Sequence, residues 1–124
     1  MSLKIISVIN SNKPEGEYVN LKTEEDVNTA GYAIVDRTFD PNSKVSNEFR
    51  HIFVFPNLKI EKGDYVFVHT GKGTYSSNAN IAKTITHHLY WGANDSVWND
   101  KGEDVASLIT YNLVNSVVAP ALAK

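Results

Sequence analysis

The stretch FRHIFVF, residues 49–55, decides the fold class of this chain. Side chains of a β-strand point alternately to two faces. One face then carries three phenylalanines and His51, and the other carries Ile52 and Val54 beside Arg50. Both faces are largely apolar, which is typical of a strand at the centre of packed sheets rather than at an exposed edge.

Similar runs recur along the chain, so strands are expected throughout. The stretches LKIISVI (3–9) and YVFVHT (65–70) are apolar or aromatic on both faces. Turn residues separate such runs, as in NKPEG (12–16) and EKGD (61–64). The predicted strands are residues 3–10, 17–22, 31–38, 49–56, 65–70, 89–92, 105–110 and 113–118. A helical turn is predicted only at 80–85, inside the long segment 71–88.

The chain is predicted to be a single all-β domain spanning residues 1–124. A length of 124 residues is ordinary for one hydrophobic core. Short strands at this spacing, without long helices between them, favour an immunoglobulin-like antiparallel β-sandwich of about eight or nine strands.

Composition excludes several classes of protein. The chain has no cysteine, which removes disulfides and thiolate metal sites. Its 12 basic and 14 acidic residues are mixed along the chain, which argues against a strong polyanion binder. No stretch approaches the roughly 20 apolar residues that cross a bilayer, so no membrane insertion is expected. The apolar run at residues 1–6 is too short for a signal peptide. The sequence is compatible with a cytoplasmic protein and with an exported one.

Four segments taken in order resemble the lamin tail domain family over residues 3–118, as in its stand-alone, prokaryotic-type members. They are EYVNL (17–21), NTAGYAI (28–34), FP (55–56) with GDYVFV (63–68), and YWG (90–92) followed by VWNDKGED (97–104). The resemblance implies an immunoglobulin-like sandwich without enzymatic activity. Lamin tail domains occur in nuclear intermediate-filament proteins and, in bacteria and archaea, alone or attached to secreted or surface proteins.

The resemblance also implies structural roles for particular residues. Gly31 would form the turn into a strand, Pro56 would end a strand and Gly63 would precede another. Trp98 and Gly102 would shape the hairpin before the last strands.

The chain departs from the family pattern at four places. Asn20 replaces a common acidic residue, Tyr32 a frequent tryptophan, and Asn112 stands where an Asp-Gly turn usually joins the final hairpin. The insert from Lys72 to Thr86 is unusual in length.

The histidines are the sharpest candidates for a metal site. His69 ends one predicted strand, and His87 and His88 lie farther along the chain. Three imidazoles bind zinc when they converge. Adjacent residues of an extended segment point to opposite faces, however, so His87 and His88 are not expected to ligate together. No metal or cofactor is predicted.

Other motifs are weaker. The stretch HTGKGT (69–74) is similar to a phosphate-binding loop but lacks the Walker spacing. Two acidic clusters, one of Glu24, Glu25 and Asp26 and one of Asp100, Glu103 and Asp104, lack calcium-loop spacing. No nucleophile elbow is present, so the chain is not expected to be an enzyme.

Aromatic and imidazole residues gather around the insert and mark a candidate contact surface. Tyrosine and tryptophan are enriched in binding hot spots. Trp98 is expected in the core. The candidate surface consists of Tyr75, His87, His88, Tyr90 and Trp91.

A noncatalytic interaction module is the function expected from these observations, with a protein, a surface polymer or another copy of the chain as partner. The alternative is an accessory nucleic-acid-binding domain, which needs lysines gathered on one face. The lysines concerned are Lys59, Lys62, Lys72, Lys83 and Lys101. Hydrolase activity has the least support.

Overall fold

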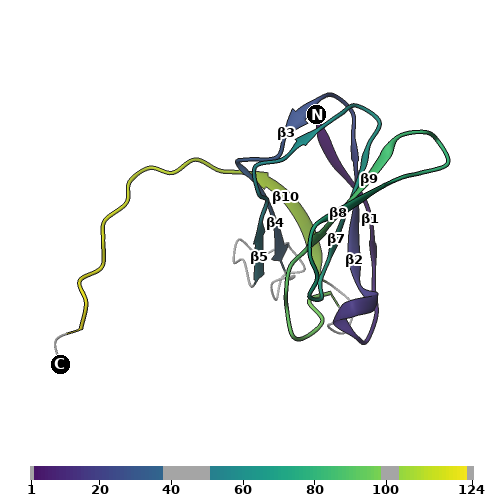
Figure 1. Ribbon diagram of the computed structural model, residues 1–124. Coiled ribbons are helices and arrows are strands. Elements are labelled where there is room, and N and C mark those ends of the chain that lie inside the picture. The colour runs from purple at the N-terminus through teal and green to yellow at the C-terminus, as the bar shows by residue number, and fades with distance from the viewer. Residues whose placement is uncertain (1, 38–50, 99–103, 123–124) are drawn as a thin grey trace, which may run out of the picture.

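The protein is built of β-strands joined by turns (Figure 1). The computed structural model describes residues 2–37, 51–98 and 104–122. A short 3-10 helix, η1, covers Pro14–Gly16. The strands are β1 (Leu3–Ile9), β2 (Tyr18–Thr23), β3 (Val27–Asn28), β4 (Tyr32–Arg37), β5 (His51–Val54), β6 (Lys59–Ile60), β7 (Tyr65–His69), β8 (Ser76–Ala79), β9 (Ile85–Tyr90) and β10 (Val105–Thr110).

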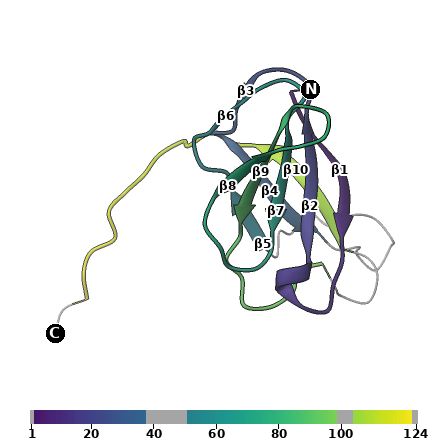
Figure 2. The same cartoon turned by 45° about the vertical axis from the view of Figure 1, so that its right-hand side comes forward.

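The strands form two larger sheets and one small one. The five-stranded sheet has the order β1-β2-β7-β9-β8, the three-stranded sheet the order β10-β4-β5, and β3 pairs with β6. All pairs are antiparallel except β7 with β9. The two larger sheets face each other (Figures 1 and 2). The prediction of an all-β architecture built of packed sheets is confirmed.

Alternation along β2 shows how the sequence sets the sheet. Val19 and Leu21 are buried, whereas the alternating residues Tyr18 and Asn20 lie on the outer face. Two turns depend on glycine, because Gly31 and Gly63 adopt φ values of 87° and 92°, where a side chain is strained. Both glycines therefore occupy turns next to strands, as expected.

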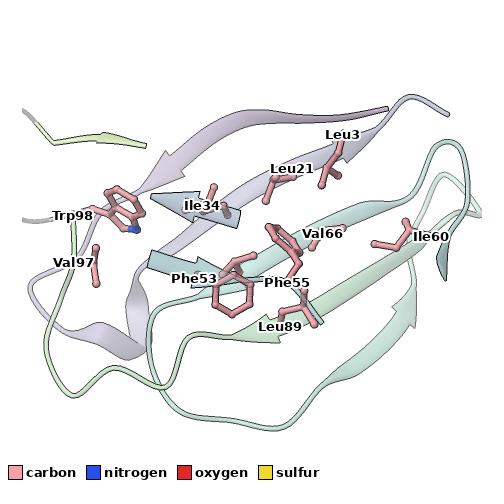
Figure 3. Close-up of a cluster of buried hydrophobic side chains, with 12 residues drawn as sticks. Leu3, Leu21, Ile34, Phe53, Phe55, Ile60, Val66, Leu89, Val97 and Trp98 are labelled. Atoms are coloured by element: carbon pink, nitrogen blue, oxygen red, sulfur yellow. The ribbon is translucent and has the colours of Figure 1, made fainter. Parts of the chain in front are cut away.

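The core lies between the two larger sheets (Figure 3). Leu21 and Val66 of the five-stranded sheet face Ile34 and Phe53 of the three-stranded sheet. Trp98 is 3% exposed and closes one end of this core, so its predicted burial is confirmed. Figure 3 also labels Leu3, Phe55, Ile60, Leu89 and Val97.

Two strands predicted to be central lie at sheet edges instead. Among the described residues β1 pairs only with β2, and β5 pairs only with β4. Ile52 and Val54 are each 50% exposed on the outer face of β5. The prediction was wrong because apolar alternation reports the faces of a strand and carries no information about its neighbours. Phe49, Arg50 and Thr38 lie outside the described residues.

The insert from Lys72 to Thr86 forms strands rather than a helical turn. It contains β8 and the tight turn into β9, so the strand predicted at 89–92 begins earlier, at Ile85. The Asn80 side chain holds this turn, because its Oδ1 accepts hydrogen bonds from the backbone N–H groups of Ala82 and Thr84 at 3.0 and 3.2 Å. Lys83 adopts a φ of 63° in the same turn.

The strand predicted at 113–118 does not form. After β10 the chain runs away from both sheets (Figures 1 and 2). Residues 111–122 belong to no helix or strand and are exposed. The two-residue strands β3 and β6 were missed, because such short elements carry no periodic pattern.

Candidate binding surface

Five rings on the outer face of the five-stranded sheet contact one another and form what we call the aromatic face. Strand alternation places them there, because their neighbours Val19, Val66, Val68 and Leu89 are buried in the core. Each of the five side chains is partly exposed. The aromatic face consists of Tyr18, Phe67, His69, His88 and Tyr90.

Strand pairing brings these rings into contact. The parallel register of β7 and β9 sets Phe67 opposite His88, and His69 opposite Tyr90. The Tyr18 and Phe67 ring centroids are 4.8 Å apart, and those of His69 and Tyr90 are 4.9 Å apart, both pairs nearly parallel. Stacked pairs of this kind stabilise the sheet beyond simple burial. The rings therefore form one continuous surface across three strands.

A chain of hydrogen bonds links the two histidines of the aromatic face. His88 Nε2 lies 2.7 Å from Asn78 Oδ1, and His69 Nε2 lies 2.9 Å from His88 Nδ1. The Asn78 oxygen only accepts, so His88 donates to it and its Nδ1 accepts from His69. Burial lowers the pKa of His69, and the charge of His88 lowers it further. His69 therefore takes up a proton less readily than a free imidazole.

A hollow of about 350 Å³ lies beside the aromatic face, under the β8–β9 turn. The Asn20 Oδ1 atom is buried there and accepts no hydrogen bond from any residue that the structure describes. A buried acceptor without a donor costs about 1–3 kcal/mol. The hollow thus suits a group that brings apolar surface together with a hydrogen-bond donor. Its lining residues are Asn20, Tyr65, Phe67, Asn80, Ile81, Ala82 and Thr86.

His87 points to the opposite side of the sheet and lies in a second hydrogen-bonded chain. Its Nε2 is 3.0 Å from Asp64 Oδ2, and its Nδ1 is 2.8 Å from the Tyr75 hydroxyl. The carboxylate accepts from Nε2, so the hydroxyl of Tyr75 donates to Nδ1. Both ring nitrogens are therefore occupied, and the side chain is 9% exposed.

Asp64 is the anchor of this second chain. Burial raises the pKa of its carboxyl, but hydrogen bonds from His87 and from the backbone N–H groups of Ile85 and Glu61 lower it more, so the net pKa lies below its usual value. These contacts tie the turn before β7 to the start of β9. The arrangement joins two segments more than twenty residues apart.

The five residues predicted as one contact surface divide among three places. His88 and Tyr90 lie on the aromatic face. Tyr75 and His87 lie together on the inward side, where Tyr75 is 45% exposed and His87 is buried. Trp91 packs against the core, with its ring 5.7 Å from Phe53 and 5.9 Å from Trp98. The five residues do not lie on one surface, because His87 and His88 are neighbours in β9 and face opposite ways.

The weaker motifs also receive definite positions. In the 69–74 stretch Gly71 is buried, and a Cβ at Gly73 would lie 2.5 Å from the Tyr90 ring, so this glycine lets the segment cross that ring closely. Asp26 accepts a hydrogen bond from Lys62 N at 2.8 Å. Asp100 and Glu103 lie outside the described residues. No group of three metal-binding side chains occurs in the ranges that the structure describes.

Sequence reasoning missed five residues of the two sites, namely Tyr18, Asn20, Asp64, Phe67 and Asn78, and considered His69 only as a metal ligand. The alternation of β7 already separated Tyr65, Phe67 and His69 from Val66 and Val68, and this was the available signal for an aromatic face. The partners from β2 and β8 depend on sheet order, which alternation does not encode.

No family model matches this chain, and no curated protein matches it. In the described part of the chain no helix has the length and apolar character needed to cross a membrane.

Proposed function

We propose that this protein is a noncatalytic interaction module of the lamin tail type, which binds a protein partner through the aromatic face and the adjoining hollow. The observation that carries this function is Asn20 Oδ1, a buried acceptor without a donor among the described residues, in the hollow beside the aromatic face. The partner inserts an apolar side chain into the hollow, and the Asn20 side chain turns outward to accept a hydrogen bond from it.

The chemistry of the aromatic face favours a protein over a polyanion. Protein-binding patches are enriched in aromatic residues, with charge kept to the rim. At the rim here Lys22 lies 5.7 Å from the centre of the Tyr65 ring. A partner that covers the face excludes water from rings that are now partly wet, which makes burial favourable.

The second hydrogen-bonded chain supports a structural role rather than catalysis. A general base needs a ring nitrogen that reaches the substrate. Both nitrogens of His87 are engaged, one by Asp64 and one by Tyr75. The ring therefore holds the β8 side of the sheet in place instead of accepting a proton from a ligand.

The family type rests on the resemblance, and several features of the fold support it. The chain is all-β, Gly31 and Gly63 take positive φ in turns, and Trp98 is buried. The immunoglobulin-like arrangement of the strands is part of this proposal. Gly102, which the resemblance also singles out, lies outside the described residues.

The lysines give the nucleic-acid alternative little support. Lys62 lies in the turn before β7, and Lys83 lies in the turn between β8 and β9. These two turns are close, because a Cβ built at Gly63 would lie 3.2 Å from the Thr84 side chain. Lys72 follows the opposite end of β7. Lys101 lies outside the described residues. Phosphate binding needs several such charges on one face.

Asn20→Leu tests the function directly. It removes the orphaned acceptor and fills the hollow, so we expect a higher thermal midpoint together with loss of partner binding, since sites for binding are commonly built at a cost in stability. Binding is measured by retention of a partner from cell extract on the immobilised chain, followed by cross-linking. Phe67→Lys should lose the same partner.

Ile52→Lys is the matched control, because Ile52 is a half-exposed apolar residue on the other sheet. It should retain the partner. Equal retention by all three variants, or a lower midpoint for Asn20→Leu, would contradict the proposed function. So would salt-sensitive retardation of DNA or RNA, or ester, phosphoester or glycoside hydrolysis that Tyr75→Phe abolishes.

A further inference from the structure

The C-terminal segment is an apolar strand sequence without a sheet. Leu113, Val114, Val117 and Val118 are between 83% and 97% exposed. Branched and apolar residues at this density are typical of a strand that packs against a core. Figure 1 shows the segment leaving β10 and running free of both sheets. These apolar side chains are therefore exposed to water, although such side chains are usually buried in a core.

The chain immediately before this segment disfavours a return to its own sheet. Residues 111 and 112 are the only link between β10 and Leu113. A two-residue hairpin needs positive φ at both positions, or glycine first. Asn112 tolerates positive φ, but the bulky Tyr111 does not. Instead, Tyr111 N donates to Gly31 O at 2.9 Å, which continues the β10–β4 ladder outward.

The neighbouring edges of β10 and β1, which we call the seam, are not paired with each other in the described part of the chain. Within the described residues β10 pairs only with β4, and β1 pairs only with β2 (Figure 2). Core-facing residues along this seam are only partly buried, whereas core residues of the central strands are fully buried. The partly buried residues are Ile5 and Val8 of β1, and Ala106 and Leu108 of β10.

We infer that residues 113–118 of one copy add as a strand to the β10 edge of a second copy, closing the seam beside β1. The six residues match the six of β10. The exchange buries the apolar side chains of the donated strand against the half-covered residues of the acceptor. It also pairs backbone groups of an edge strand that otherwise offers a template for aggregation.

A second copy is the natural occupant because every copy carries both halves of the contact. The donor segment and the β10 edge belong to one chain, and the tail extends away from its own body. Reciprocal exchange then closes into a two-fold symmetric dimer, the usual outcome of domain swapping. The aromatic face lies on the outer side of the five-stranded sheet and stays free for its own partner.

The first experiment measures molar mass by light scattering and sedimentation over a range of chain concentrations. We expect a species of twice the 13.8 kDa chain mass. Tyr111→Asn combined with Asn112→Gly creates a hairpin turn of the type that two-residue loops prefer, so the segment folds back and the protein becomes monomeric while its β-sheet circular dichroism is kept. Val114→Asp with Val118→Asp should also give monomers.

The second experiment locates the contact. Because the chain has no native cysteine, a spin label attaches only to the cysteine that is introduced. An unlabelled chain carrying a spin label at Asn115→Cys is mixed with isotope-labelled wild type. We expect intermolecular broadening of the amides of Ile5, Val8 and Leu108. The same mixture made with the Asn-Gly linker in both chains should show none.

Several outcomes would overturn the inference. They are a monomeric wild type at the highest attainable concentration, a dimer that survives both sets of tail substitutions, and broadening centred on residues outside the seam. Phe67→Lys keeps this test separate from the proposed function. It should abolish partner binding and leave the dimer intact, and a dimer lost only through Phe67→Lys would refute strand exchange.

Discussion

Replacing Asp64 by alanine is expected to unfold the protein at markedly lower denaturant concentration. Asp64 Oδ1 accepts from Ile85 N at 3.0 Å, and Oδ2 accepts from Glu61 N at 3.2 Å and from His87 Nε2 at 3.0 Å. The carboxylate is 7% exposed and His87 is 9% exposed. The substitution therefore leaves three donors without their acceptor.

The magnitude follows from these three contacts. The two backbone groups are partly buried and regain some water, so each accounts for about 1 kcal/mol. The buried His87 Nε2–H accounts for up to about 2 kcal/mol, less where the ring changes tautomer and donates to Tyr75 instead. The sum is about 2–4 kcal/mol, a large share of the roughly 5–15 kcal/mol that stabilises a domain.

Urea unfolding followed by tryptophan fluorescence measures the loss. With a slope of about 2 kcal/mol per molar, the midpoint should fall by about 1–2 M. Asp26→Ala is the matched control, because Asp26 accepts one backbone hydrogen bond in the same turn region but is exposed. Its loss should stay below about 1 kcal/mol. If both variants unfold at the same midpoint, Asp64 does not anchor β9.

Three further predictions concern pH and the core. The fold lowers the pKa of Asp64 from 3.8. Its contribution to the free energy of unfolding is therefore present above pH 3.8 and is lost as the pH falls through the folded pKa. The urea midpoints of wild type and Asp64→Asn should converge in acid, and a gap that stays constant with pH would refute this. The fold lowers the pKa of His69 from 6.5. The folded protein therefore binds a proton at His69 more weakly than the unfolded chain does, and the free energy of unfolding decreases as the pH falls below 6.5. His69→Phe should make this decrease smaller, and an unchanged pH dependence would show that another group causes it. Trp98→Ala should cost about 3–5 kcal/mol in urea unfolding, whereas Trp98→Phe should cost much less, since Trp98 Nε1 has no partner among the described residues; equal losses would contradict the packing role.

Much of the strand layout was available from local pattern. Alternation and turn residues located the strands at 3–9, 18–23, 32–37, 65–69 and 105–110 to within a residue or two. The insert was misread because polar residues such as Ser76 and Ser77 carry no apolar period, although they pair with β9. A strand that is exposed on both faces leaves no signature in hydrophobicity.

By itself the sequence determined that this chain forms strands, where most of them run, and that Trp98 enters the core, because alternation and turn chemistry act over a few neighbouring residues. Only the tertiary structure decided which strands are neighbours. The parallel pairing of β7 with β9 stacks His69 on His88 and Tyr90, and the turn before β7 brings Asp64 to His87. The order of strands in a sheet depends on contacts between segments far apart in the sequence. These contacts form only when the whole chain packs around a shared core, so no local pattern encodes them.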